Sequence, residues 1–139
     1  MNFLLDTCVV SELVSKAPDR KVLTWLDGLD EFRLYLSVLT LGELHQGVAA
    51  LAAGARQKRL AEWIDRDLVP RFGGRILPIS EDVATHWGRF AGDARRRGAK
   101  MPVIDSLLGA TAVVHGLTFA TRNTRDVRGT GARVFDPWA

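Results

Sequence analysis

Three acidic residues lie at junctions between an apolar run and the segment that follows it. Asp6 comes directly after the apolar residues 2–5, and Glu43 lies early in the helical pattern that follows residues 34–37. Asp105 lies in the first turn of the helical pattern that opens after Pro102. Carboxylates transfer protons and bind hard cations, so a group of them is typical of a hydrolytic site.

Each acid also has a purely structural explanation. Asp6 fits the N-cap of the following helix, and residues 40–43 (TLGE) match a capping box that would end on Glu43. Asp105 would gain about 0.3–1 kcal/mol from the helix dipole, although its apolar neighbours make an unpaired carboxylate costly. Taken one at a time, the residues leave both interpretations open.

The chain alternates strand-like runs with helical patterns, which predicts parallel strands joined by right-handed crossovers. We expect one three-layer α/β domain over residues 1–139. The expected strands are Asn2–Leu5, Leu34–Ser37, Arg75–Leu77, Leu117–Ala120 and Arg133–Phe135. The expected helices are Val9–Val14, a short one closed by Gly28, one from Leu41 toward Gly54, one from Leu60 to Pro70, one from Val83 to Gly98 and one from Ile104 to Gly116.

The ends of parallel strands share one rim of a sheet, where ligands of such folds bind. Three or four carboxylates gathered there would repel one another and raise one another's pKa values. A divalent cation removes that conflict, and oxygen ligands without a Cys or His cluster suit Mg²⁺ or Mn²⁺. Basic clusters at 95–100 and 122–128 suit a polyanion, so the residues favour a metal-dependent phosphodiesterase.

Composition is that of an ordinary globular domain. Hydrophobic residues make up 47% of the 139 residues, charged residues make up 25%, and the net charge is +3. No apolar run approaches the roughly 20 residues of a membrane helix, and no secretory leader pattern opens the chain. Cys8 is the only cysteine, which excludes an intrachain disulfide and fits a cytoplasmic protein. We expect its thiol to be a small packed residue rather than a nucleophile.

Three ordered blocks of sequence carry a family resemblance. The segments LLDTCVVSEL, LTLGEL and PVIDSLLGATAVVHGLTFATRNTRDV resemble the PIN-domain nucleases from end to end of the chain. More closely, the sequence resembles the toxins of VapBC and FitAB type toxin–antitoxin pairs, and GRILPIS and VFDPWA suggest the FitB-like subgroup. The resemblance implies a central five-stranded parallel sheet flanked by helices, and an endoribonuclease that depends on Mg²⁺, with Mn²⁺ as a substitute.

By motif match, the resemblance also implies the residues of the site. The expected catalytic acids are Asp6, Glu43, Asp105 and Asp126, and the expected metal ligands are these four and Asn123. Relatives differ in the fourth acidic position, where Asn123 and Asp126 are the alternatives, with Asp126 preferred. The expected nucleic-acid contacts are Thr7, Thr121, Arg122 and Lys100.

The resemblance further implies partners. A small antitoxin would cover the site with its C-terminal part and bind operator DNA with its N-terminal part, so that operator DNA is reached only through the antitoxin. RNA would be the substrate, the toxin would form a homodimer, and no membrane is involved. The alternative is a PIN-fold binding module that is catalytically weak or inactive, for which Asn123 in place of an acid is the best argument. A phosphatase or DNA nuclease using the same rim is a third interpretation.

Overall fold

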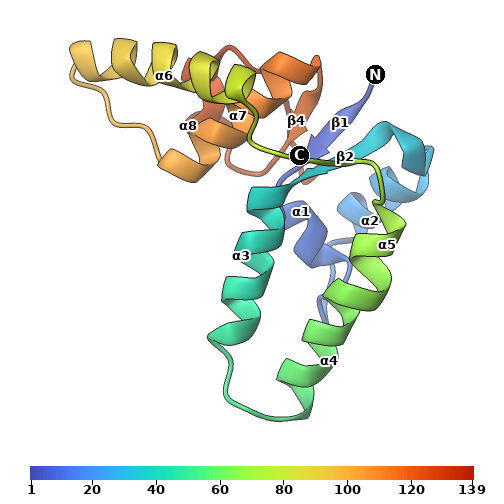
Figure 1. Cartoon of the computed structure of the whole chain (residues 1–139). Coiled ribbons are helices and arrows are strands. Elements are labelled where there is room, and N and C mark those ends of the chain that lie inside the picture. Colours follow the sequence, from blue (N-terminus) through green and yellow to red (C-terminus); the bar gives the residue numbers. More distant parts are fainter.

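A computed structural model describes all residues 1–139, and its centre is a five-stranded parallel sheet (Figure 1). The strands lie in the order β3-β2-β1-β4-β5, and every neighbouring pair is parallel. This confirms the predicted three-layer α/β fold. The bounds of the strands are β1 Phe3–Leu5, β2 Leu34–Ser37, β3 Ile76–Leu77, β4 Thr118–Ala120 and β5 Val134–Phe135, each within one residue of the prediction.

Helices connect the strands and cover both faces of the sheet. In Figure 1, α3 and α4 form a hairpin on one side of the molecule, and α6 and α7 form a pair on the other side. None of the helices is long and apolar enough to cross a membrane. Their bounds are α1 Thr7–Glu12, α2 Arg20–Asp27, α3 Val38–Ala49, α4 Ala55–Trp63, α5 Val69–Arg71, α6 Glu81–Arg96, α7 Val103–His115 and α8 Thr124–Val127, with short turns η1 Glu31–Arg33, η2 Ile64–Leu68 and η3 Arg128–Thr130.

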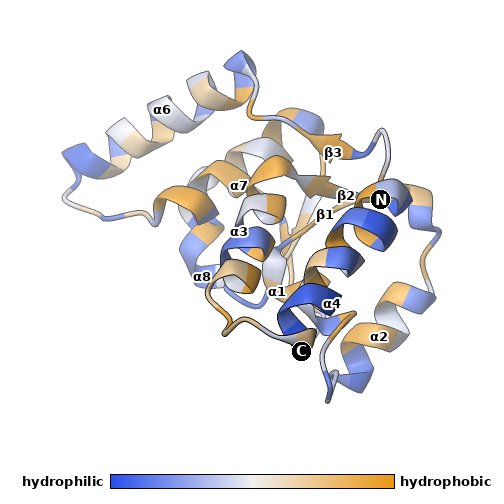
Figure 2. Cartoon of the chain, turned by 60° about the horizontal axis from the view of Figure 1, so that its bottom comes forward, coloured by the Kyte–Doolittle hydropathy of each residue, from blue (hydrophilic) through white to orange (hydrophobic).

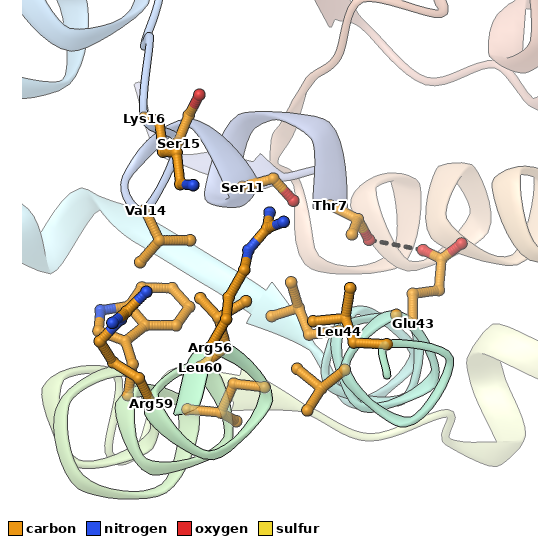
Figure 3. Close-up of a pocket in the computed structure, with 15 residues that line it drawn as sticks. Thr7, Ser11, Val14, Ser15, Lys16, Glu43, Leu44, Arg56, Arg59 and Leu60 are labelled. Atoms are coloured by element: carbon orange, nitrogen blue, oxygen red, sulfur yellow. Dashed lines mark hydrogen bonds between the residues drawn. The ribbon is translucent and has the colours of Figure 1, made fainter. Parts of the chain in front are cut away.

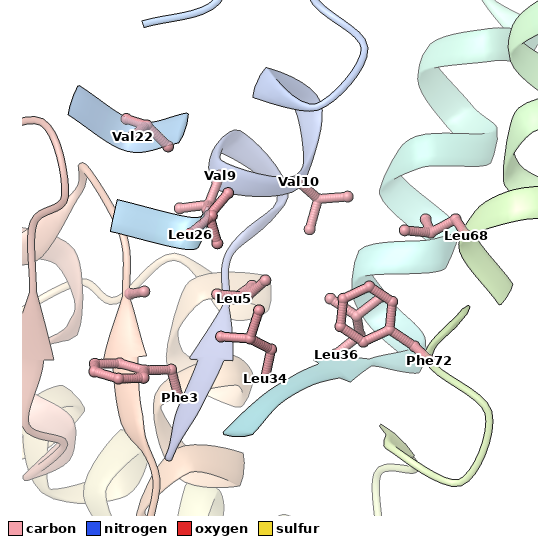
Figure 4. Close-up of a cluster of buried hydrophobic side chains, with 11 residues drawn as sticks. Phe3, Leu5, Val9, Val10, Val22, Leu26, Leu34, Leu36, Leu68 and Phe72 are labelled. Atoms are coloured by element: carbon pink, nitrogen blue, oxygen red, sulfur yellow. The ribbon is translucent and has the colours of Figure 1, made fainter. Parts of the chain in front are cut away.

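Alternate residues of each strand pack into two different cores. Phe3 and Leu5 of β1 join the larger cluster with α1 and α2 (Figure 4). Leu4 between them joins the cluster on α7 and α8. Figure 2 shows the strands in hydrophobic colour and hydrophilic segments on α2, α4 and the end of α6. A sheet buried on both faces needs apolar residues at every position, which explains the continuous apolar run before Asp6.

The helix that was predicted to stop at Pro70 continues past it. The turn η2 between α4 and α5 is a π-type turn in which the N–H of Val69 bonds to the carbonyl of Ile64. Proline removes a backbone donor and crowds the preceding turn of an α-helix, and a π-type turn is a common accommodation of such strain. Pro70 therefore lies inside a continuous helical segment that ends at Arg71.

Five helices begin earlier than predicted, among them α1 and α3, and one helix was not predicted. Helix α1 begins at Thr7 instead of Val9, and α3 begins at Val38 and ends at Ala49, before Gly54. Residues 124–127, expected as a polar turn, form the short helix α8. The early starts place Asp6 and Ser37 directly at helix N-termini.

A close contact at Gly109 sets the distance between α7 and the segment from α8 to η3. A Cβ atom at Gly109 would lie 2.6 Å from Oγ1 and 2.8 Å from Cγ2 of Thr130. Thr130 is buried, its hydroxyl donates to the carbonyl of Val127 (2.6 Å), and it accepts from the N–H of Ala132 (3.2 Å). Because these bonds hold the threonine in place, only glycine lets the two segments approach this closely.

We expect Gly109→Ala to lower the free energy of unfolding by roughly 1–3 kcal/mol, because the added methyl group overlaps an immobile side chain. Urea denaturation followed by circular dichroism measures the change.

Gly92→Ala is the matched control, because Gly92 is an exposed position in the middle of α6 with open space around its Cα. The free energy of unfolding of that variant should rise by about 0.5–1 kcal/mol. A Gly109→Ala variant as stable as the wild type would contradict the close-contact argument.

Candidate active site

The site lies where the order of the strands reverses. The chain passes from β1 to β2 and β3 on one side and returns to β4 and β5 on the other, so β1 and β4 flank the topological switch point. Asp6 directly follows β1, and Thr121 directly follows β4. The hydroxyl of Thr121 donates to Oδ2 of Asp6 at 2.6 Å, and both residues are buried. An acid therefore occupies the crevice where open α/β sheets bind their ligands.

The carboxylate of Asp6 has a structural and a site-facing oxygen. Oδ1 accepts the N–H of Thr7 at 2.8 Å, which confirms that Asp6 is the N-cap of α1. Oδ2 accepts the Thr121 hydroxyl and lies 3.5 Å from Sγ of Cys8. Hydrogen bonds to the charged form allow this carboxylate to be only 4% exposed.

Glu43 is held by α1 and does not cap its own helix. The hydroxyl of Thr7 donates to Oε1 of Glu43 at 2.5 Å, which joins the ends of β1 and β2 through side chains. The alternative that residues 40–43 form a capping box is wrong, because the N-cap is Ser37, whose hydroxyl accepts the N–H of Leu39 at 3.0 Å. The hydroxyl of Thr40 is buried without a partner.

Asp105 is the third acid of this group. It lies half-buried in the first turn of α7. Burial and, after it, the charges of Asp6, Asp126 and Glu43 together raise its pKa from 3.8 to about 6. The mutual repulsion predicted for acids on one rim is thus present, and α1, α3, α7 and α8 supply its members.

The donor set fits a hard divalent cation. Every candidate ligand is oxygen, and the repulsion around Asp105 is the conflict that a cation relieves. No three His, Cys, Asp or Glu side chains converge into a complete ligand group. Mg²⁺ in proteins usually keeps several waters beside its carboxylate ligands, and substrate phosphate can supply further oxygens.

The two alternatives for the fourth acidic position differ in charge and in contacts. Asn123 precedes α8, and its N–H donates to the hydroxyl of Thr121 at 3.0 Å, while its side chain is exposed. Asp126, also exposed, lies in the first turn of α8 and contributes to the raised pKa of Asp105. The electrostatics favour Asp126 as the fourth carboxylate, which stays a prediction.

The thiol of Cys8 is not activated. Burial raises its pKa to about 11, and the charge of Asp6 adds to the effect, so the group is a neutral thiol at physiological pH. The histidines do not assist it: His45 and His115 are exposed, and His86 contacts the carbonyl of Thr130. Cys8 packs against the larger core cluster.

The two basic residues predicted to contact RNA differ in how they are held. Lys100 is exposed in the connection between α6 and α7, with no hydrogen bond or ion pair. Arg122 is also exposed, but its guanidinium carbon lies 4.2 Å from the ring centroid of Trp138. No local pattern in the sequence predicts this contact, because it joins two residues 16 positions apart.

A groove extends away from the acids between α1, α3 and α4 (Figure 3). It has a volume of about 590 Å³, and Thr7 and Glu43 lie at one end of it. Figure 3 shows Lys16 and Arg59 at the other end and Arg56 between, above an apolar floor that includes Leu44. Sequence reasoning did not find this groove, whose only local signal is the i, i+3 spacing of the two arginines on α4.

Comparison with known proteins gives consistent results across sequence and structure. Residues 3–129 match the PIN domain family. Toxin FitB of Neisseria gonorrhoeae is 39% identical, with 97% of each chain covered. VapC ribonuclease Y4jK of Sinorhizobium fredii is 36% identical, with 97% of this chain and 96% of that protein covered. The structure of FitAB bound to the IR36 DNA fragment superimposes with a TM-score of 0.92 at 37% identity, over 99% of this chain and 96% of that one.

The raised pKa of Asp105 predicts a pH-dependent stability in metal-free buffer. The folded state binds this proton more tightly than the unfolded chain does, so the stabilisation is complete below about pH 4 and is lost as pH rises through about 6. We expect Asp105→Asn to raise the Tm at pH 7 and to matter little at pH 4, as measured by thermal unfolding in EDTA.

Asp82→Asn is the matched control, because Asp82 also lies in the first turn of a helix but is exposed. Losing its favourable interaction with the helix dipole should lower the Tm slightly. If Asp105→Asn instead lowers the Tm at pH 7 as Asp82→Asn does, the acids do not repel one another as described.

Proposed function

The chain belongs to the PIN domain family, and on that basis we propose that it is a metal-dependent endoribonuclease that acts as the toxin of a toxin–antitoxin pair. The substrate is RNA, and the reaction is hydrolysis of a phosphodiester bond. Mg²⁺ is the proposed cofactor, with Mn²⁺ as a substitute.

One observation carries this proposal: Asp105 lies near three other acids from different segments, and burial together with the charges of Asp6, Asp126 and Glu43 raises its pKa. The hydroxyl of Thr121 donates to Asp6, and the hydroxyl of Thr7 donates to Glu43. The charges of the other acids contribute to the raised pKa of Asp105. A purely structural set of acids would place each one in its own cap or ion pair. No ion pair involves any of these four carboxylates.

Asp6, Glu43, Asp105 and Asp126 would hold the cation, which when bound would neutralise phosphate charge and orient the attacking water. Water attacks the phosphorus, the bond to the 3′ oxygen breaks, and the products carry a 5′-phosphate and a 3′-hydroxyl. Both oxygens of Asp6 already accept hydrogen bonds, whereas Oε2 of Glu43 accepts none. Glu43 is therefore the better acceptor for the proton of the attacking water.

Metal binding and the choice of substrate distinguish this proposal from two alternatives. A regulatory PIN-fold module that has lost catalysis, for which Asn123 argues, would bind Mg²⁺ or Mn²⁺ weakly or not at all in calorimetry. A phosphatase or DNA nuclease would act on a phosphate monoester or single-stranded DNA. Assays of the metal-loaded protein on these substrates and on RNA separate the three.

The groove supports the proposed antitoxin partner. It is continuous with the acids, because Thr7 and Glu43 belong to both. A C-terminal segment of the antitoxin lying in it would cover the site, and acidic residues of that segment would pair with Arg56 and Arg59. We propose that the N-terminal part of the antitoxin binds operator DNA, in line with the DNA-bound FitAB structure.

We also propose that the toxin forms a homodimer in the cytoplasm. Large apolar side chains are exposed at the starts of α3 and α7: Val38 is 40% exposed and Val103 is 59% exposed. Exposed apolar side chains of this kind can be covered by a protein interface.

Asp6→Asn should reduce Mg²⁺-dependent RNA cleavage by roughly 100-fold or more, since the amide removes a charge from the cation site. The fold should persist, because asparagine is an equally good N-cap for α1. Cleavage of a labelled oligoribonucleotide and the circular dichroism spectrum measure the two effects.

Asp27→Asn, which changes an exposed acid at the end of α2, is the matched control and should cleave as the wild type does. A folded Asp6→Asn protein with full metal-dependent activity would refute the assignment of Asp6.

Gly47→Trp should separate antitoxin binding from catalysis. Gly47 lines the groove, and a Cβ atom added there would meet nothing within 4 Å, so a side chain can leave the helix at this position and the variant should fold. An indole in the groove would exclude the partner segment. We expect RNA cleavage to persist while the concentration of cognate antitoxin needed to inhibit it rises at least roughly tenfold.

Gly92→Trp, at an equally open position in the middle of α6, is the control for adding an indole to a helix. It should be inhibited by the antitoxin as the wild type is. Equal inhibition of the Gly47→Trp variant would place the partner elsewhere.

A further inference from the structure

The guanidinium of Arg122 forms no ion pair, although its backbone neighbour Thr121 bonds to Asp6. Arg122 directly follows Thr121, whose hydroxyl is bonded to Asp6. The ion pairs in the structure involve Glu31 or Asp93, and none involves Arg122. Charge-assisted pairing with a carboxylate is the usual partner of an arginine in a site rich in acids, but a different contact holds this side chain.

The face of Trp138 is the contact that holds it. The guanidinium carbon of Arg122 lies 4.2 Å from the centroid of the indole ring. A cation over the face of tryptophan is attracted by the ring quadrupole. This contact occupies the flat face of the guanidinium and leaves the N–H groups at its edge available.

The tryptophan is itself fixed by the end of the chain. Its ring packs against the core cluster that contains Phe3 and Val9. The backbone N–H of Trp138 donates to Oδ1 of Asp136 at 2.8 Å, and the backbone carbonyl of Asp136 accepts the N–H of Ala139 at 3.2 Å. The indole Nε1 is buried without a partner, so packing and the C-terminal turn, not a bond from the ring nitrogen, set the position of the ring.

We propose that Trp138 is a positioning residue for the substrate: it holds Arg122 away from the acids and presents the edge of the guanidinium to a phosphate of the RNA backbone. The substrate class in this inference rests on the proposed function. Without the ring, the guanidinium would be drawn onto the neighbouring carboxylates, which would neutralise one ligand of the cation and remove one phosphate contact.

Kinetics of RNA cleavage with Mg²⁺ test the role of Trp138 through a double-mutant cycle. Trp138→Leu and Arg122→Ala should each raise KM roughly tenfold. Trp138→Phe, which keeps an aromatic face, should restore most of the loss. Trp138→Leu should add little in the Arg122→Ala background, because its effect passes through that side chain.

Trp25→Leu is the matched control for a loss of packing. Trp25 contacts the same core cluster, with its ring centroid 5.0 Å from that of Phe3, but does not touch Arg122. It should lower the Tm without changing KM. The proposal is overturned if Trp138→Leu raises KM by the same factor with and without Arg122, since the two effects would then be independent.

Nuclear magnetic resonance of the arginine side chains tests the contact without relying on any activity. The indole ring current should shift the Arg122 Nε–Hε signal upfield in the wild type, and Trp138→Leu should abolish that shift. An Arg122 signal unaffected by Trp138→Leu overturns the positioning role. A wild type that keeps the shift but cleaves no RNA with Mg²⁺ or Mn²⁺ refutes the proposed function while upholding the positioning of Arg122.

Discussion

The carboxylate of Asp6 is the constraint on which the rest of the site depends. It ends β1, caps α1 through the N–H of Thr7 and joins β4 through the hydroxyl of Thr121. A buried carboxylate needs hydrogen-bond donors for its oxygens, and here one donor is the next residue in the chain and the other lies 115 residues away. The register between β1 and β4, in which Leu5 pairs with Ala120, sets Asp6 and Thr121 side by side.

The same group of acids that would bind a cation also lowers the stability of the folded protein. Burial and the neighbouring acids raise the pKa of Asp105, so keeping this group charged at neutral pH destabilises the folded protein. The core tolerates this because two apolar clusters pack on opposite faces of a sheet buried on both sides. Close contacts such as Gly109 against Thr130 then keep α7 near the segment that follows α8, and with it Asp105 near Asp126.

Cationic side chains around the acids are kept from neutralising them. The indole of Trp138 occupies the guanidinium of Arg122, and the arginines of α4 lie along the groove and pair with none of the four acids. Negative charge at the switch point thus stays available for a cation, and positive charge beside it stays available for a polyanion or an acidic partner segment. The separation depends on which faces and helices carry each charge, not on the net charge of +3.

The sequence by itself determined the five strands, the positions of most helices and the acids that follow the strands. These features depend on apolar periodicity and on neighbours within a few residues, which the chain order contains. Pro70 was misjudged because a π-type turn absorbs it, and Glu43 was open to a capping role because TLGE matches a local motif. Tertiary structure decided the partner of Glu43, 36 residues away in Thr7, and the bond between Thr121 and Asp6, 115 residues apart. It also decided that Arg122 rests on Trp138. Such contacts follow from the strand order and from the exact helix starts, which arise when distant segments pack together and which no local pattern specifies.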